Sequence, residues 1–234
     1  MKHLIETTNL SSLGNAKYDR LILDSTTNEI IYRGGVTYEY VDLGLPSGLK
    51  WAKCNVGAEK ETDYGDYFMW GSTTPNTASQ CTWSNAPFNN GLDSYNEEYF
   101  NTHKSEWLDD NNNLKPEYDA ASHIMGGDWR MPTKAEFDEL LNGTTNEWIP
   151  NYNGTGVKGM KFTSKTNGNS IFIPAAGRCS DGSVNGVVYY GDVWSSSLYT
   201  STPYNAWSLL FGDEGCDMSR DSRYFGQSVR GVRK

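Results

Sequence analysis

The chain has 234 residues, enough for one large domain or one domain with a short appendage, and such a core needs no disulfide or metal. Its formal net charge of −9 and its pI near 4.8 argue against nucleic acid or an anionic membrane as a partner, because both are negatively charged. No stretch is long and apolar enough for a membrane span, so no membrane insertion is expected. A protein or a neutral sugar is the favoured partner.

Residues 1–35 are predicted to form a short β-rich extension. Two apolar runs, at 18–24 and 29–32, flank the polar residues 25–28, which is typical of a hairpin. Two roles stay open for this extension, namely homo-oligomerisation and docking to a larger particle such as a virion. No apolar signal-peptide segment occurs in residues 1–14. We therefore expect an intracellular product that leaves its producer by lysis or through a leader that this sequence lacks.

Strands are predicted at residues 37–41, 49–56 and 64–70 from apolar alternation and aromatic content. Residues 88–115 are polar, rich in Asn and without period, which predicts a long surface loop or an insertion. Within it, the oxygen-rich run at 109–113 could bind calcium, but it lacks the loop Gly and the terminal Glu of an EF-hand. A solvated turn is the favoured interpretation there.

Two helices are predicted next. Pro116 can open a helix over residues 117–124, because its missing N–H costs nothing in the first turn. The second helix is better marked. Thr133 and Glu136 form a capping box ahead of apolar residues at helical spacing, and Gly143 is predicted to end it.

An Asn-Gly pair at Asn167 and Gly168 predicts a hairpin between strands at 160–164 and 170–174, since Gly accepts the positive φ of such a turn. Strands therefore lie before and after the two helices. This order predicts an α+β fold of mostly antiparallel sheets, in which the final strands return beside the first.

The four cysteines, Cys54, Cys81, Cys179 and Cys216, contain no CxxC pair and no His at ligand spacing. No metal site and no cofactor are therefore predicted, and free thiols are favoured, although two disulfides stay open.

No Ser, Cys or carboxylate is placed by a motif beside a His, and no phosphate-binding loop occurs. No catalytic residue is predicted.

The strongest indication of function is the composition of residues 179–225, which hold five Tyr and five Asp but no Lys and one Glu. Recognition loops have such a composition, because Tyr gives a large, stiff contact area while Ser, Gly and Asn adapt their hydrogen bonds. The alternative is a β domain whose loops are polar for no functional reason.

Several ordered motifs carry a resemblance over residues 36–234. They include VDLGLPSGLKWA at 41–52, GGDWRMPT at 126–133, FIPAAG at 172–177 and WSS at 194–196. Together they resemble the Fibrobacter succinogenes major paralogous domain family, which has a C-type lectin fold and includes the variable proteins of diversity-generating retroelements. The calcium and saccharide tripeptides of sugar-binding C-type lectins are absent from this sequence. Cys179 and Cys216 are also too far apart in sequence to match the copper-binding pair of the related formylglycine-generating enzymes.

The resemblance implies that adenine miscopying turns Asn codons into codons of the form NNC, which never encode Trp, Met, Lys, Glu or Gln. It places the variable ligand-binding surface within residues 178–225. The predicted fixed scaffold includes Trp51, Trp129, Trp194, Trp207, Phe211, Met218, Arg223, Gln227 and Arg230. The predicted ligand-binding residues are Asp181, Tyr190, Asp192, Tyr199, Thr200, Thr202, Tyr204, Asn205, Ser208, Leu210, Asp213, Asp217, Ser219, Asp221, Ser222 and Tyr224.

The function implied is recognition of a protein or cell-surface ligand of a host or target cell by a hypervariable, non-enzymatic protein encoded by a phage or prophage. A phage tail or a bacterial cell surface is the expected location. The alternative is a non-variable structural or glycan-binding domain of the same family, and a less favoured one is an enzyme on the related scaffold.

Overall fold

The computed structural model describes residues 2–5, 21–24, 29–32 and 38–234. The chain divides into two compact units, Met1–Tyr38 and Glu39–Lys234. The predicted boundary at residues 35 and 36 lies outside the described residues.

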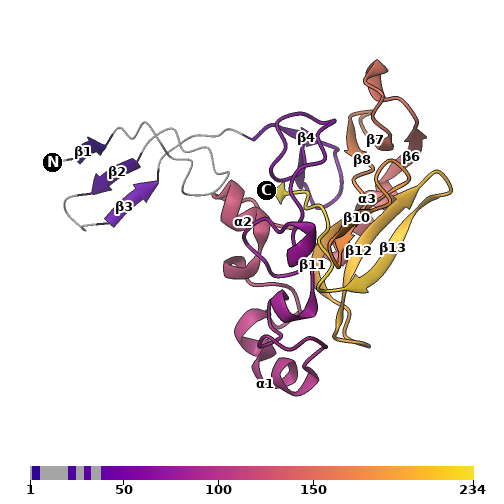
Figure 1. The fold of residues 1–234 in the computed structure, drawn as a ribbon. Helices are drawn as coiled ribbons and strands as arrows, with labels where there is room; N and C mark the ends of the chain where they lie inside the picture. The colour runs from indigo at the N-terminus through magenta and orange to yellow at the C-terminus, as the bar shows by residue number, and fades with distance from the viewer. Residues whose placement is uncertain (1, 6–20, 25–28, 33–37) are drawn as a thin grey trace. The chain divides into compact units, whose positions relative to one another are not determined.

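The first unit contains a three-stranded antiparallel sheet in the order β1-β2-β3 (Figure 1). Its strands are β1 (Lys2–Ile5), β2 (Leu21–Asp24) and β3 (Glu29–Tyr32). Asp24 pairs with Glu29 in the β2–β3 register, so the two predicted hairpin strands do pair, while their turn lies outside the described residues. Strand β1 was not predicted.

The second unit is α+β, with antiparallel sheets and few helices, as predicted (Figure 1). Its sheets have the orders β14-β5-β4, β6-β7-β8, β11-β12-β13 and β10-β9. The helices are α1 (Glu97–Trp107), α2 (Ala120–Met125) and α3 (Lys134–Gly143). The strands are β4 (Tyr40–Asp42), β5 (Lys50–Ala52), β6 (Thr144–Ile149), β7 (Gly159–Ser164), β8 (Ser170–Pro174), β9 (Arg178–Ser180), β10 (Ser183–Asn185), β11 (Tyr190–Leu198), β12 (Asn205–Gly212), β13 (Gly215–Ser222) and β14 (Val232–Arg233).

The capping box predicted for α3 is confirmed. The Thr133 side chain accepts from the Glu136 N–H, and the Glu136 carboxylate accepts from the Thr133 N–H. Arg130 clamps the same carboxylate with two hydrogen bonds of 2.6 and 2.7 Å. Gly143 is the last helical residue, and a Cβ there would collide with the Leu45 side chain. Close packing therefore adds to the reasons for glycine at this end.

The prediction of one helix over residues 117–124 is wrong in detail, because Asp119 interrupts it. Pro116–Tyr118 form a 3₁₀ turn, Asp119 is extended, and α2 begins at Ala120. The buried Asp119 carboxylate accepts from the N–H groups of Ser122 and Met131, at 2.9 and 2.8 Å. It therefore caps α2 and ties it to the chain that leads into α3.

Of the two interpretations of residues 88–115, a surface loop is wrong in part, because this stretch contains α1. Asn96 caps the helix by accepting from the Tyr99 N–H, and Phe100 and Trp107 are buried. The ring of Phe88 stacks on Trp107 at 4.4 Å. Aromatic residues thus recur at helical spacing along one side of α1, a signal that the polar composition concealed.

The first and last strands of the second unit lie in the same sheet. In the β14–β5 register Val232 pairs with Trp51, which confirms the predicted return. The predicted hairpin is also confirmed, since β7 and β8 pair antiparallel and Gly168 has φ +77°. The strand predicted at residues 64–70 is wrong, because only Phe68 forms a bridge there, to Gln227.

Two large hydrophobic clusters form the core of the second unit. One contains Trp51 and Phe137, and the other contains Trp70 and Trp194. Three of the four tryptophans predicted to be scaffold are buried, namely Trp51, Trp129 and Trp194. Trp207 is only half-buried. Its ring contacts the Tyr199 ring and the Lys134 ammonium.

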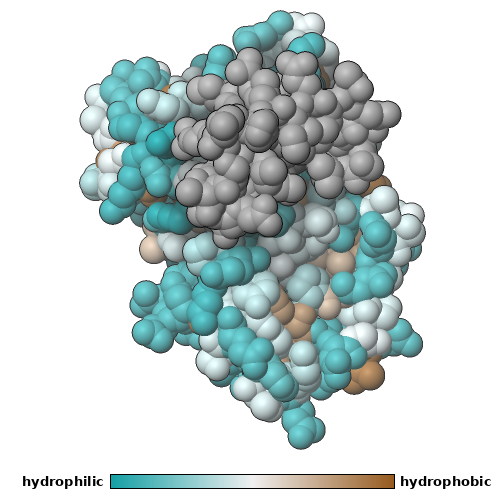
Figure 2. Space-filling model, turned by 90° about the vertical axis from the view of Figure 1, so that its left-hand side faces the viewer, coloured by the Kyte–Doolittle hydropathy of each residue, from teal (hydrophilic) through white to brown (hydrophobic). Residues whose placement is uncertain are grey.

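The outer surface is mainly polar on the face shown in Figure 2, where hydrophobic residues are scattered. Among the helices that the structure describes, none is both long and apolar enough to cross a membrane.

Candidate recognition surface

The sheet β11-β12-β13 carries most of the predicted ligand-binding residues (Figure 1). Side chains of a strand alternate between its two faces, and paired residues share a face. Leu209 and Phe211 of β12 belong to the core cluster under α3. Leu210, paired with Asp217 of β13, must therefore point to the opposite face. That face is the centre of the candidate surface.

The structure places the predicted residues in three classes of exposure. Buried residues cannot touch a macromolecular ligand, so the prediction is wrong for the two buried ones, Asp192 and Ser208, which are 0% exposed. The half-buried ones are Tyr190, Tyr199, Thr202, Asn205, Ser219, Asp221, Ser222 and Tyr224. The exposed ones are Asp181, Thr200, Tyr204, Leu210, Asp213 and Asp217.

A polar cluster explains why Ser208 and Asp192 are buried. Ser208 donates to Asp221 at 3.2 Å, and Gln227 donates to the same oxygen at 2.8 Å. Arg178 donates to the other Asp221 oxygen at 2.9 Å and lies 3.6 Å from Asp192. Neither Asp192 oxygen accepts a hydrogen bond from any group that the structure describes. Burial, reinforced by the Asp221 charge, raises the pKa of Asp192 to about 8, although Arg178 opposes this.

The predicted residues do not form one patch. Asn205 pairs with Ser222, and both lie on the face of Trp207, the face opposite to that of Leu210. Tyr199 is on the Trp207 side as well, with its ring 4.9 Å from the Trp207 ring. The face to which each side chain points depends on where the strands begin and on how they pair. The sequence alone therefore could not show that these residues lie opposite Leu210.

The tyrosines at the edge of the sheet rest on residues outside the segment 178–225. Tyr224 packs on Trp83 at 5.1 Å and donates to Asp181 at 3.2 Å. Tyr204 packs against Tyr95 at 5.8 Å. Aromatic side chains from residues 83–95 thus contact both of these tyrosines.

Three residues of the surface were not among the predicted ones. Tyr189 is 72% exposed and Val184 is 44% exposed, and Arg178 links Asp221 to Asp192. The described chain exposes six large hydrophobic side chains, and four of them lie within residues 178–225, namely Val184, Tyr189, Tyr204 and Leu210. For Tyr189, the Tyr-Tyr pair at 189 and 190 was a signal visible in the sequence.

The candidate surface is acidic. Within residues 178–225, all of which the structure describes, the exposed charged residues are Asp181, Asp213, Glu214, Asp217 and one cation, Arg220. Arg223 is buried among aromatic rings, with its guanidinium 4.1 Å from the centre of Phe100. A ligand of positive charge is therefore favoured by the surface electrostatics.

Cys81 and Cys179 lie next to each other, although 98 residues separate them, with their sulfurs 2.8 Å apart. Sequence spacing could not reveal this pair. All four cysteines are free thiols in the structure. No group of three or more His, Cys, Asp or Glu that could hold a metal occurs among the described residues. The Asp109 turn is closed by hydrogen bonds from the N–H groups of Asn111 and Asn113.

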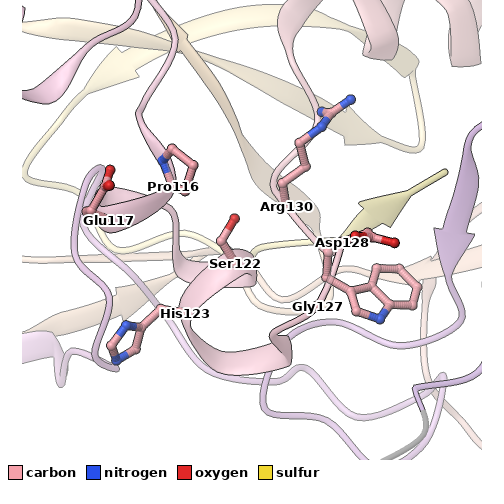
Figure 3. Close-up of a pocket in the computed structure, with 8 residues that line it drawn as sticks. Pro116, Glu117, Ser122, His123, Gly127, Asp128 and Arg130 are labelled. Atoms are coloured by element: carbon pink, nitrogen blue, oxygen red, sulfur yellow. The ribbon is translucent and has the colours of Figure 1, made fainter. Parts of the chain in front are cut away.

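A shallow pocket of about 520 Å³ lies elsewhere, lined by residues 116–130 (Figure 3). Its lining includes Ser122, His123 and Asp128, but the Ser122 side chain and the His123 ring point apart (Figure 3). The Arg130 guanidinium at its edge is held by Glu136. The residues that line this pocket therefore include no nucleophile placed beside a base.

Comparisons with known proteins add no further residue assignments. No family model, no curated protein and no solved structure matches the chain. The family resemblance therefore stays a prediction.

Proposed function

We propose that residues 39–234 form a ligand-binding domain with a C-type lectin fold, whose exposed side chains within residues 178–225 recognise a protein on the surface of another cell. The observation that carries the proposal is that four of the six exposed large hydrophobic side chains among the described residues lie within residues 178–225, namely Val184, Tyr189, Tyr204 and Leu210. Exposed aromatic and aliphatic groups on a stiff support are what a binding hot spot requires. The proposal assigns no reaction to this surface.

The arrangement of the scaffold supports the fold part of the proposal. The first and last strands of the domain, β4-β5 and β14, share a sheet, and α3 packs against β11-β12-β13. Residues of the resembling motifs, such as Trp51, Trp194 and Arg230, are fully buried. These positions therefore serve packing, which leaves the loops between them free to vary.

We extend the proposal to diversification by a retroelement, in a protein of a phage tail or a bacterial cell surface. Its support is the division of residue types between surface and core. The exposed hydrophobic and Asp residues of the segment are all encodable by NNC. Four residues of the segment cannot be encoded by NNC: Trp194 is buried, Trp207 and Met218 are half-buried, and Glu214 is exposed at the β12–β13 turn.

The DNA next to the gene tests diversification. We expect a reverse transcriptase gene and a near-copy of the codons for residues 178–225 that differs from them only at adenines. If independent isolates carry an identical segment and no such copy, the domain is a fixed member of its family and this part of the proposal is wrong.

Tyrosine substitutions test whether the surface is separate from the core. Tyr189→Ala and Tyr204→Ala are expected to lower the free energy of unfolding by about 1 kcal/mol or less, because the two residues are 72% and 41% exposed. The matched control is Tyr67→Ala, which removes a half-buried ring and a 2.6 Å hydrogen bond to the Ala176 carbonyl, at a cost of about 2–4 kcal/mol. Urea unfolding measures all three. Equal losses would place Tyr189 and Tyr204 in the core and contradict the proposal.

A further inference from the structure

Two buried thiols meet directly beneath the edge of the candidate surface. Cys179 is in β9, and Cys81 follows a 3₁₀ turn at Ala78–Gln80. Both side chains are 0% exposed, and their sulfurs are 2.8 Å apart. A disulfide bond is about 2.05 Å long, so the sulfurs need to approach by less than about 1 Å to form one.

The surrounding backbone holds both cysteines in this position. Gly226 exchanges two hydrogen bonds of 2.8 Å with Cys179, and a Cβ at residue 226 would collide with both sulfurs. The Asp181 N–H donates to the Cys81 carbonyl at 3.0 Å, and the Gly182 N–H donates to the Ala78 carbonyl at 3.1 Å. Two backbone hydrogen bonds thus join the two chain segments next to the thiols, and Gly226 leaves the space that the two sulfurs occupy.

We propose that Cys81 and Cys179 form a disulfide bond when the chain folds in the presence of a small-molecule disulfide. The Cys179 thiolate attacks the small disulfide, which forms a mixed disulfide and releases one small thiol. The Cys81 sulfur then loses its proton and attacks the Cys179 sulfur, which releases the second small thiol. The protein loses two thiol hydrogens, and the small disulfide is reduced to two thiols.

The hydrogen bond between the two thiols fits this order of attack. The two thiols share one hydrogen bond, in which either sulfur can donate. This bond lowers the pKa of Cys179 and raises that of Cys81, which fits Cys179 as the first attacking sulfur. The bond would join residue 81 to β9 and thereby fix Asp181, which accepts from Tyr224. It does not depend on the proposed function.

Refolding of the whole chain with oxidised or with reduced glutathione tests the proposal. After oxidised refolding, two of the four thiols are expected to resist titration in denaturant, and a non-reduced digest should link Cys81 to Cys179. Because the bond closes a loop of about 100 residues, the melting temperature should rise by on the order of 10 °C over the reduced protein. The double variant Cys54→Ser/Cys216→Ser should keep this shift, and Cys81→Ser should lose it.

Three results would overturn the proposal. The first is titration of all four thiols after oxidised refolding. The second is a digest that links a different pair. The third is recovery of two blocked thiols on addition of EDTA without a reductant, which would indicate a bound metal in place of the disulfide.

Discussion

Arg230→Ala is expected to lower the free energy of unfolding by about 3–5 kcal/mol, because it leaves buried acceptors without their donor. The guanidinium is fully buried and donates to the Asn55 side chain and to the carbonyls of Ala52, Lys53 and Phe172 at 2.6–3.0 Å. These acceptors belong to the β5 region and to β8, so one side chain joins parts of the chain that are far apart in sequence. Urea unfolding at neutral pH measures the loss.

Two control variants separate this role from a general effect of charge. Arg233→Ala removes a partly exposed arginine three residues later, whose carboxylate partner lies 3.6 Å away, and should cost about 0.5 kcal/mol or less. Arg230→Lys keeps the charge but not the planar fork, so it should remain well below the wild type in stability. If Arg230→Ala is as stable as Arg233→Ala, the buried guanidinium does not hold the domain together.

Asp192→Asn is expected to raise stability at pH 8 and to change it little at about pH 3, below the ordinary pKa of an Asp carboxyl. The pKa of Asp192 is about 8 in the folded protein, against an ordinary value of 3.8. Between these values the unfolded chain has lost the proton and the folded protein keeps it, so stability falls as the pH rises. One pKa unit corresponds to about 1.4 kcal/mol, and the variant should therefore gain up to about 5 kcal/mol at pH 8 and above.

The charged groups around Asp192 set the limits of this prediction. Arg178 stabilises the ionised form, whereas Asp221 opposes it. The control Asp213→Asn, at the exposed tip of the β12–β13 hairpin, should stay within about 0.5 kcal/mol of the wild type at both pH values. A loss of stability in Asp192→Asn at pH 8 would show that the carboxylate is ionised and that its pairing with Arg178 stabilises the fold.

Local signals predicted the elements that local interactions determine. Helix α3 was found from its capping box, and the β7–β8 hairpin from its Asn-Gly pair, because each depends on residues a few positions apart. Helix α1 was missed because its polar residues outnumber the aromatic ones that pack inward. The break at Asp119 also escaped, because its second partner, the Met131 N–H, is twelve residues away.

The candidate surface was predicted from composition, and the sequence could not assign its side chains to the two faces of the sheet. Tyr and Asp content located the segment, since binding residues have a distinctive composition. Burial of Asp192 and Ser208 depends on Gln227 and on the chain that leads into β14, which the sequence does not place beside β11. The Cys81–Cys179 pair was missed for the same reason, because 98 residues separate its members.

A display selection with two libraries tests most directly whether this surface is built for recognition. Both libraries are randomised with NNC codons at six exposed positions and selected against the same folded protein. The first varies Asp181, Val184, Tyr189, Tyr204, Leu210 and Asp217, and the control varies Glu97, Asn101, Thr102, Lys104, Ser105 and Glu106 in α1. We expect most clones of both libraries to fold and specific binders to come from the first alone. Binders at equal frequency from both libraries, or unfolding of most clones in the first, would contradict the recognition surface.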